Sequence, residues 1–276
     1  MDVSTIMTLR PVSVGPDDTV GHVFRLMEEQ DIRHVPVVEE GAVLGVLSDR
    51  DLLSRLGWHG VPDMPQPAQD PTAQPARELM KGDVTTVSPD DSVVTAAVEF
   101  TCGGIGCLPV LDDGHLVGIV TEMDMAMAYW GACRAGLLDG DIDPLVEKSM
   151  TAEPHSVGPD TTLAEACALV RQHHVRHLPV VDGERLVGVV SDRDLRASQA
   201  SDPEGDTRVA TIMTTYPVVI HEDEHLGRAA ERMVRHRISC LPVVRGRQLV
   251  GILSLRDVLD HCIDCLREAE PRTTRT

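Results

Sequence analysis

The stretch RHVPVVEEGAVLGVLSDRDL, Arg33–Leu52, decides the fold, because it returns almost intact as RHLPVVDGERLVGVVSDRDL at Arg176–Leu195. Looser copies are GCLPVLDDGHLVGIVTEMDM at Gly106–Met125 and SCLPVVRGRQLVGILSLRDV at Ser239–Val258. Self-similarity of this kind predicts an architecture of repeated supersecondary units. The chain therefore contains four copies, called repeats 1 to 4 in chain order.

Four landmark residues keep the same spacing in every copy. A Met precedes a Pro by 29 residues, the Pro precedes a Gly by 9, and the Gly precedes an Asp by 6. They are Met7, Met80, Met150 and Met213; Pro36, Pro109, Pro179 and Pro242; Gly45, Gly118, Gly188 and Gly251; and Asp51, Asp124, Asp194 and Asp257. A block of 45 residues thus recurs four times without insertion or deletion, which chance does not produce.

Each copy shows the same order of short secondary-structure signals. In repeat 1 an extended stretch, Pro11–Val14, precedes a GPDDT turn and an apolar pattern at helical spacing. Two β-branched runs, His34–Val38 and Ala42–Leu47, are separated by EEG and predict a hairpin. Ser48 then opens a second helix that extends to Leu56. The predicted unit is β-α-β-β-α, an α/β (α+β) fold.

The first helix of each copy has one apolar face that we expect to be buried. These faces are Val20, Val23, Phe24 and Met27; Val93, Ala96, Ala97 and Phe100; Leu163, Ala166, Cys167 and Val170; and Leu226, Ala229, Ala230 and Met233. Three strands and two helices leave part of a sheet uncovered, so the copies must pack on one another.

Repeats 1 and 3 resemble each other more than their neighbours, with 12 identical residues of 21 between Ile32–Leu52 and Val175–Leu195. This pattern indicates a duplicated two-copy unit and predicts that repeat 1 pairs with 2, and repeat 3 with 4. The predicted repeats are 1–58, 76–130, 145–198 and 208–266. The segments between them are a Pro-rich linker at 59–75 and linkers at 131–144 and 199–207, and a flexible tail covers 267–276.

Composition restricts the partners. A formal charge of −19 and a pI near 4.9 argue against a DNA- or RNA-binding surface, which needs a basic face. A mononucleotide-binding site remains compatible with this net charge. At physiological salt the field of a charge fades within roughly 8 Å, so an Arg beside the ligand outweighs more distant carboxylates. Seven scattered cysteines and no apparent signal sequence or membrane-spanning run predict a soluble, cytoplasmic protein with reduced thiols.

The Gly-to-Asp landmarks belong to a heptad of Gly, hydrophobic, any, Ser/Thr, any, any, Asp. It reads GVLSDRD, GIVTEMD, GVVSDRD and GILSLRD at Gly45–Asp51, Gly118–Asp124, Gly188–Asp194 and Gly251–Asp257. On these residues the chain resembles proteins with four cystathionine-β-synthase-type (CBS) domains in two tandem Bateman modules, over nearly all of its length. The resemblance implies paired domains whose clefts bind adenosine-type ligands and which regulate or sense without catalysing.

The end of this heptad has two interpretations. A helix N-terminus with a hydroxyl suits a phosphate, and the Asp three residues later suits a ribose diol as acceptor. We therefore assign phosphate contacts to Ser48, Thr121, Ser191 and Ser254, and ribose contacts to Asp51, Asp124, Asp194 and Asp257. The alternative is a capping box, which needs no ligand, and the two roles can coexist.

A basic pair distinguishes the odd copies. Arg33–His34 and Arg176–His177 begin three residues before the Pro, where the even copies have Gly106–Cys107 and Ser239–Cys240. The resemblance implies that a basic residue here faces the ligand phosphate. Arg offers a bidentate fork, and the His adds a charge if its pKa is raised. The alternative is a solvated Arg at a strand end. We expect the adenine to rest on apolar strand positions such as Val12 and Val37.

The predicted function is a stand-alone sensor of AMP, ADP or ATP that acts on an unknown protein partner. S-adenosylmethionine and a cyclic dinucleotide are further ligand candidates, and no cofactor, metal or catalytic residue is predicted. The repeats are expected to form a flat disc, within one chain or as a homodimer. The alternatives are a ligand-free scaffold and a nucleotide-metabolism enzyme, since the resembling modules occur in IMP dehydrogenase, but no residues remain for a catalytic barrel.

Other motifs have a plainer explanation. His221 and His225 match the HExxH zinc pattern, but the repeat register puts them across a turn and a helix cap. Cys262 shares an apolar helical stripe, which favours buried small residues over a Cys262/Cys265 metal or redox pair. His173, His174 and His177 span a helix-to-strand turn. Trp58 and the pair Tyr129–Trp130 anchor an interface or pack locally.

Overall fold

A computed structural model describes residues 1–56, 71–136, 143–199, 202 and 204–269. Each repeat contains a short N-terminal segment, a helix, a two-stranded hairpin and a second helix, which confirms the predicted α/β class. The predicted linkers 59–75, 131–144 and 199–207 fall partly outside the described residues, as do Trp58 and most of the predicted tail.

The elements of the first two repeats follow one plan. Repeat 1 comprises η1 (Val3–Thr5), β1 (Thr8–Leu9), α1 (Val20–Gln30), β2 (His34–Glu39), β3 (Ala42–Ser48) and α2 (Asp49–Leu56). Repeat 2 comprises η2 (Pro71–Ala73), η3 (Ala76–Glu78), α3 (Val93–Gly103), β4 (Cys107–Asp112), β5 (His115–Thr121) and α4 (Glu122–Arg134). Helix α4 therefore continues into the segment that the sequence predicts to be a linker.

The last two repeats follow the same plan. Repeat 3 comprises η4 (Val146–Lys148), β6 (Thr151–Ala152), α5 (Leu163–His173), β7 (His177–Asp182), β8 (Arg185–Ser191) and α6 (Asp192–Gln199). Repeat 4 comprises α7 (Val209–Ile212), β9 (Thr214–Thr215), β10 (Ile220–His221), α8 (Leu226–His236), β11 (Cys240–Arg245), β12 (Gln248–Ser254) and α9 (Leu255–Ala269). Helix α9 continues past the predicted start of the tail.

Helix α1 begins where the sequence pattern indicates. Thr19 caps α1 by accepting a hydrogen bond from the His22 amide, and Asp31 ends the helix in the left-handed region at φ 51°. The predicted apolar faces of the four first helices are buried, except that Phe24 is only partly buried. The predicted strand Pro11–Val14 is shorter than expected, because only Val14 pairs there, with Val37.

Pairing within each module depends on exchanged N-terminal segments. Strand β1 of repeat 1 pairs with β5 of repeat 2, β6 of repeat 3 with β12 of repeat 4, and β9 of repeat 4 with β8 of repeat 3. Lys81 of repeat 2 pairs with Val46 of repeat 1 in the same way. The predicted pairing of repeat 1 with 2, and of 3 with 4, is confirmed.

The exchange explains two of the four sequence landmarks. Met80 lies against Gly45 and Met7 against Gly118, so the Met of one repeat covers the Gly of its partner. Met150 on Gly251 and Met213 on Gly188 repeat the arrangement. A Cβ at any of these glycines would come within 2.4–2.7 Å of the Met side chain, closer than packing allows.

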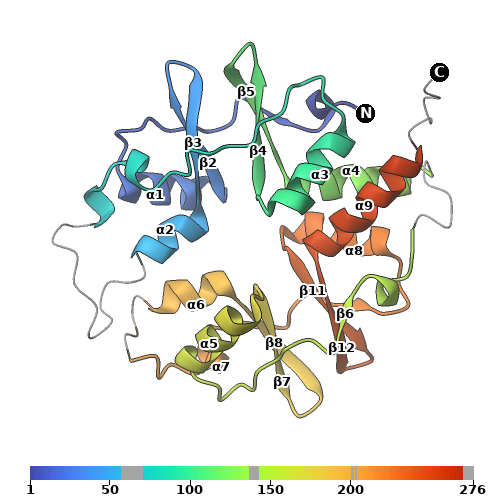
Figure 1. Cartoon of the computed structure of the whole chain (residues 1–276). Coiled ribbons are helices and arrows are strands. Elements are labelled where there is room, and N and C mark those ends of the chain that lie inside the picture. Colours follow the sequence, from blue (N-terminus) through green and yellow to red (C-terminus); the bar gives the residue numbers. More distant parts are fainter. Residues whose placement is uncertain (57–70, 137–142, 200–201, 203, 270–276) are drawn as a thin grey trace.

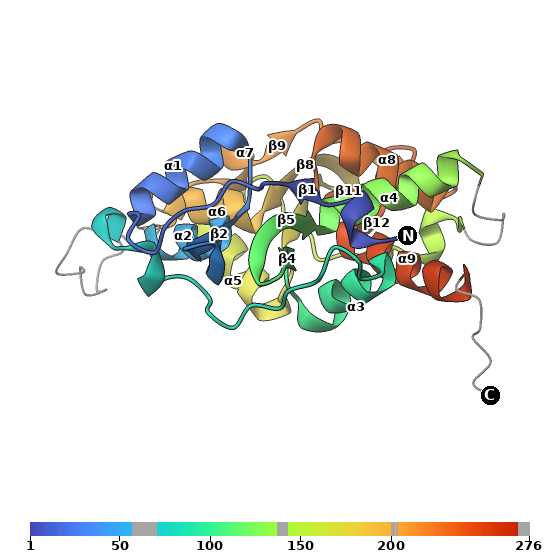
Figure 2. The same ribbon diagram turned by 90° about the horizontal axis from the view of Figure 1, so that it is seen from above.

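Figure 1 shows the four repeats as the quarters of a disc, and the view from above in Figure 2 shows that the disc is flat. Two sets of helix–helix contacts join the modules, and an ion pair from Arg237 to Asp31 also links repeat 4 to repeat 1. Repeats 1 and 3 meet through α2 and α6, which we call the odd seam. Repeats 2 and 4 meet through α3 and α4 packed against α8 and α9, which we call the even seam.

The hydrophobic core is divided among the repeats, but the even seam joins two of its parts. Ala126 and Tyr129 of α4 belong to the core of repeat 4, and Leu259 and Ile263 of α9 belong to the core of repeat 2. The cores of repeats 1 and 3 are separate clusters. Within the described part of the chain, no helix is long and apolar enough to cross a membrane.

Candidate functional site

Each hairpin ends at a completed helix cap. In repeat 3, Asp194 Oδ2 accepts hydrogen bonds from the Ser191 amide at 2.9 Å and from its hydroxyl at 2.6 Å, and the Asp194 amide donates back to Ser191 Oγ at 3.2 Å. The other three repeats repeat this pattern at Ser48–Asp51, Thr121–Asp124 and Ser254–Asp257. A complete capping box is therefore present in all four copies.

The cap uses only one carboxylate oxygen of each Asp, which leaves Oδ1 for another partner. In repeat 1 that partner is Lys81, whose Nζ lies 3.3 Å from Asp51 Oδ1. Among the described residues, Oδ1 of Asp124, Asp194 and Asp257 has no such partner. Capping and ribose binding are thus geometrically compatible in these three copies.

One cavity of about 1300 Å³ opens at the centre of the disc, and all four repeats contribute to its lining. Ten of the twelve predicted site residues line it: Arg33, His34, Ser48, Asp51, Thr121, Asp124, Arg176, His177, Ser191 and Asp194. Ser254 and Asp257 are not among the residues that line this cavity, although Leu255 of the same heptad is. Residues of repeat 4 that do line it include Arg237 and Ser239.

Arg33 and Arg176 are both exposed and both face this cavity. Burial and the neighbouring Arg50 lower the pKa of Arg176, while Glu122 partly opposes that effect. The guanidinium groups of the two odd repeats therefore lie within one electrostatic environment. An anion in the cavity would relieve the repulsion between Arg50 and Arg176.

The two histidines do not carry the charge that the sequence analysis considered. Burial lowers the pKa of His34 and of His177 to about 4, so both are neutral at physiological pH. The His34 ring lies directly across from Gly106, where a Cβ would come within 2.4 Å of Nε2. His177 Nε2 lies 3.4 Å from Ser239 Oγ. Each His therefore packs against the partner repeat, at the position that matches Arg33 or Arg176.

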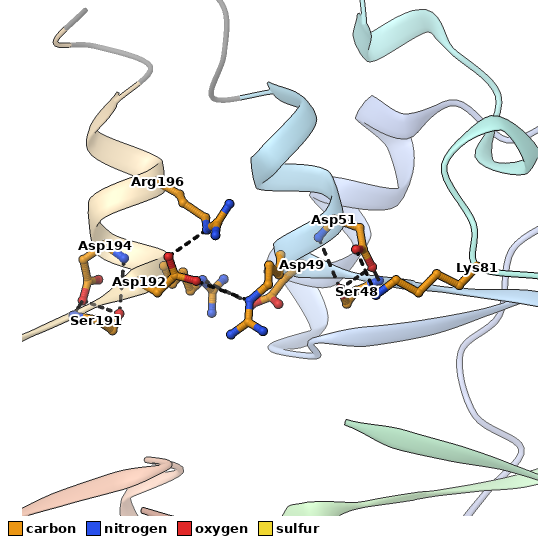
Figure 3. A network of polar contacts seen from close by, with 10 residues as sticks. Ser48, Asp49, Asp51, Lys81, Ser191, Asp192, Asp194 and Arg196 are labelled. Atoms are coloured by element: carbon orange, nitrogen blue, oxygen red, sulfur yellow. Dashed lines mark hydrogen bonds and ion pairs between the residues drawn. The ribbon is translucent and has the colours of Figure 1, made fainter. Parts of the chain in front are cut away.

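The ion pairs of the odd seam, which Figure 3 shows from close by, were not among the predicted contacts. Arg50 Nε lies 3.3 Å from Asp192 Oδ2, and Arg193 Nε lies 3.6 Å from Asp49 Oδ2. Arg196 Nε adds a bond of 2.9 Å to Asp192 Oδ1. The available signal was the SDRD tetrapeptide, which only repeats 1 and 3 contain.

Glu122 is a second residue that the sequence analysis did not identify. It begins α4 at the position that matches Asp49 and Asp192, and it lines the cavity. Burial raises the pKa of this carboxyl, while Arg176, Arg256, Arg50 and Arg33 lower it. Arginines of three repeats are thus close enough to act on one acid at the centre of the disc.

The adenine platform was predicted only in part. Val12 lines the cavity and is partly exposed, as expected for a surface that a ligand could cover. Val37 is fully buried in the core of repeat 1, so the expectation for this residue was wrong. Val37 faces inward because the alternation along β2 directs it toward the core.

The competing motifs do not assemble into sites. His221 ends β10 and His225 caps α8, so the HExxH residues do not share a helix face. His174 ends α5 in the left-handed region, apart from His177 in β7. Cys262 is buried in the even seam, whereas the Cys265 side chain lies outside the described part of the chain, so the pair itself stays a prediction. Over the residues that the structure describes, no group of three or more His, Cys, Asp or Glu could hold a metal ion.

The aromatic pair on α4, Tyr129 and Trp130, contacts repeat 4 at the even seam. Tyr129 is buried in the core of repeat 4, and its ring meets the His261 ring edge-on, with 6.0 Å between centroids. The Arg235 guanidinium lies 5.8 Å from the centre of the Trp130 ring. Both contacts cross the even seam.

Comparison with known proteins agrees with this architecture. The chain is 26% identical over 272 residues to protein MJ1225 of Methanocaldococcus jannaschii, covering 91% of this chain and 94% of that protein. Its fold matches the crystal structure of MJ1225 with a TM-score of 0.78, over 95% and 99% of the two chains, at 22% identity. A conserved protein of Pyrococcus horikoshii matches with a TM-score of 0.67 at 27% identity, over 95% and 100%.

The sequence also matches part of an enzyme. It is 34% identical over 149 residues to the inosine-5′-monophosphate dehydrogenase of Korarchaeum cryptofilum, but this match covers only 29% of that enzyme and 52% of this chain. The model of the CBS domain family matches residues 3–57, 76–131, 141–201 and 209–264. The chain therefore belongs to the CBS domain family and contains four CBS domains, arranged as two Bateman modules.

Proposed function

We propose that this protein is a regulatory sensor that binds adenosine-type nucleotides, AMP, ADP or ATP, in the clefts between its paired CBS domains. The observation that carries the proposal is the convergence of two guanidinium groups and three free or exchangeable carboxylate oxygens on one central cavity. Eight Lys or Arg residues line the cavity and balance its eight acidic residues, although the whole chain has a net charge of −19. That concentration of basic side chains is what a phosphorylated ligand requires.

The two ends of such a ligand would meet different chemistry. Asp51, Asp124 and Asp194 offer acceptors to the ribose hydroxyls, since a carboxylate accepts but does not donate. Arg33 and Arg176 offer bidentate donors to the phosphate. With His34 and His177 neutral, the arginines supply the charge. S-adenosylmethionine and cyclic dinucleotides share the ribose and adenine groups and belong in the same screen.

Occupancy would reach a protein partner through the odd seam. Arg50, Asp192 and Arg193 line the same cavity as the phosphate-binding arginines. A phosphate placed there would compete with the carboxylates for Arg50 and Arg193, and would change how α2 lies against α6. A ligand can shift this packing only as far as its affinity differs between the two states.

The proposal is tested by thermal melting and calorimetry with a nucleotide panel. Ligand at a hundred times its dissociation constant stabilises the folded protein by about 2.7 kcal/mol, which raises the Tm measurably. Replacing both Arg33 and Arg176 by Ala should weaken AMP binding about ten- to hundredfold for each bond lost. Arg185→Ala, an exposed residue of β8 outside the cavity, is the matched control. Unchanged AMP affinity in the double variant would contradict the assignment.

A ligand-free scaffold is the second candidate, and one observation favours it. All four helix caps are complete without a ligand, so the caps need no nucleotide to be stable. A scaffold would show no melting shift with any member of the panel. We assign no enzymatic activity to the chain, because the dehydrogenase match covers only a minor part of that enzyme. A cytoplasmic location and homodimer formation are further proposals.

A further inference from the structure

The four clefts differ at one position on the exchanged N-terminal segments. In three of the clefts, a Thr of the exchanged segment pairs with the third-last residue of the partner's hairpin. These pairs are Thr8 with Ile119, Thr151 with Ile252 and Thr214 with Val189. In repeat 2 this residue is Lys81, opposite Val46. The backbone pairing is antiparallel here as well, because the amides of Lys81 and Val46 each donate a hydrogen bond of 3.1 Å to the other residue's carbonyl. Only the side chain differs.

The Lys81 side chain reaches the carboxylate that the proposed function assigns to the ribose. Asp51 Oδ2 accepts from Ser48, and Lys81 Nζ lies 3.3 Å from Oδ1, so both oxygens of Asp51 are engaged. Asp194, at the matching position of repeat 3, has the same cap and follows Arg193 as Asp51 follows Arg50. Thr214 takes the place of Lys81 there, and no ion pair to Asp194 Oδ1 is found over the residues that the structure describes. Beside Asp51 and Asp194 the two clefts therefore differ in this cation, and farther along the lining Gly104 and Asp83 of repeat 2 match Arg237 and Tyr216 of repeat 4.

We infer that Lys81 is a specificity-determining residue that makes the two arginine-bearing clefts unequal, because it competes with the ribose diol for Asp51. The inference rests on the proposed function. A ribose hydroxyl must displace the ammonium or share its oxygen, whereas the Asp194 cleft takes the diol directly. AMP therefore fills the Asp194 cleft first. In the Asp51 cleft, binding depends less on the diol.

The size of the effect follows from the exposure of the pair. The Lys81 side chain is 72% exposed and that of Asp51 is 22% exposed, so the ammonium can be displaced without leaving a buried charge. Exposed ion pairs of this kind contribute roughly 0.2–1 kcal/mol. Their competition therefore weakens binding about two- to fivefold, and does not close the cleft.

The test exchanges the two side chains. AMP is titrated by calorimetry into Asp194→Asn, which reports the Asp51 cleft, with and without Lys81→Thr. The reciprocal pair is Asp51→Asn with and without Thr214→Lys. Asn can still accept the cap hydrogen bonds, and Thr and Lys already occupy equivalent exposed positions, so the variants should fold. Melting curves check this, and Lys81→Gln is a second neutral replacement.

The expected results differ between the two clefts. Lys81→Thr should tighten AMP binding about two- to fivefold, and Thr214→Lys should weaken it by a similar factor. The analogue 2′,3′-dideoxyadenosine 5′-monophosphate, which lacks the diol, should show neither change. A merely structural role of Lys81 would alter the two ligands equally.

Two outcomes would overturn the inference, and they are distinguishable. If AMP binds but both exchanges leave its affinity unchanged, or change it equally for the dideoxy analogue, Lys81 does not set the difference and the proposed function stands. If neither the wild-type protein nor any variant responds to AMP, the proposed function fails and this inference fails with it.

Discussion

The seam between repeats 1 and 3 is held by charged side chains, whereas the seam between repeats 2 and 4 is packed with apolar ones. In the odd seam, Arg50 and Arg193 each reach across to an acid on the facing helix. In the even seam, Tyr129 and Leu259 each enter the core of the opposite repeat. Apolar burial is insensitive to small ligands, but an ion pair beside an open cavity exchanges partners at little cost.

This difference assigns different roles to the two sides of the disc. The even seam holds the modules together, since its side chains cannot separate without opening two cores. The odd seam is the side where a bound anion would disturb the ion pairs, because its arginines line the cavity. Three measurements, from the largest expected effect to the smallest, would break or sharpen this comparison.

The largest effect is expected at the even seam. Leu259 is fully buried in the core of repeat 2 although it lies on α9 of repeat 4. Leu259→Ala should lower the free energy of unfolding by about 2–5 kcal/mol, through lost burial and the cavity that remains. Urea denaturation measures this change. Met127→Ala, at a 49% exposed position on α4, is the control and should change stability by less than about 0.5 kcal/mol. Similar losses in the two variants would contradict a packed even seam.

The second effect is a pH dependence confined to the odd repeats. Burial lowers the pKa of His34 and His177 to about 4, so between pH 6.5 and 4 the unfolded chain binds protons that the folded chain does not. Stability from these groups is complete above pH 6.5 and falls as the pH decreases toward 4. The acids near them are Asp49 and Asp51 for His34, and Asp194 for His177; Arg33 and Arg50 act on both rings, and Arg176 on His177.

The even repeats supply the control for this pH dependence. Cys107 and Cys240 occupy the positions that match the two histidines, and burial raises their pKa to about 12, so they are neutral in this range. The double variant His34→Cys/His177→Cys should therefore flatten the stability profile between pH 6.5 and 4, by at least about 1 kcal/mol over the range. Denaturation at several pH values measures it. An unchanged profile would mean that the carboxylates, and not the histidines, set the acid response.

The smallest effect is expected from the odd seam itself. Arg50 is 45% exposed and Asp192 is 13% exposed, so their pair contributes no more than about 1 kcal/mol. The double-mutant cycle of Arg50→Ala and Asp192→Ala should give a coupling energy of about 0.5 kcal/mol that decreases with added salt. The loss in Leu259→Ala should not depend on salt in this way. A salt-independent coupling above about 2 kcal/mol would show that the odd seam is as rigid as the even one.

Local patterns predicted most of the elements. The apolar spacing in Val93–Phe100 and Leu226–Met233 placed helices whose faces are buried, because a helix face repeats at short range. The four Ser/Thr-to-Asp caps form as the capping-box interpretation requires. Where the prediction was wrong, the partner was remote. Val37 packs into the core that α1 and β3 complete, and α4 outlasts its predicted end because α8 and α9 cover it.

The sequence by itself determined four CBS domains, because the spacing that defines each one lies within a single copy, and the likeness between repeats 1 and 3 indicated how they pair. Only the tertiary structure decided that Lys81 reaches Asp51, that residues of all four repeats line one central cavity, and that one seam is charged while the other is apolar. The physical reason is that a repeat specifies its own hydrogen bonds locally. The neighbours of a side chain across a seam depend instead on how separate copies stack, and no spacing within a copy records that.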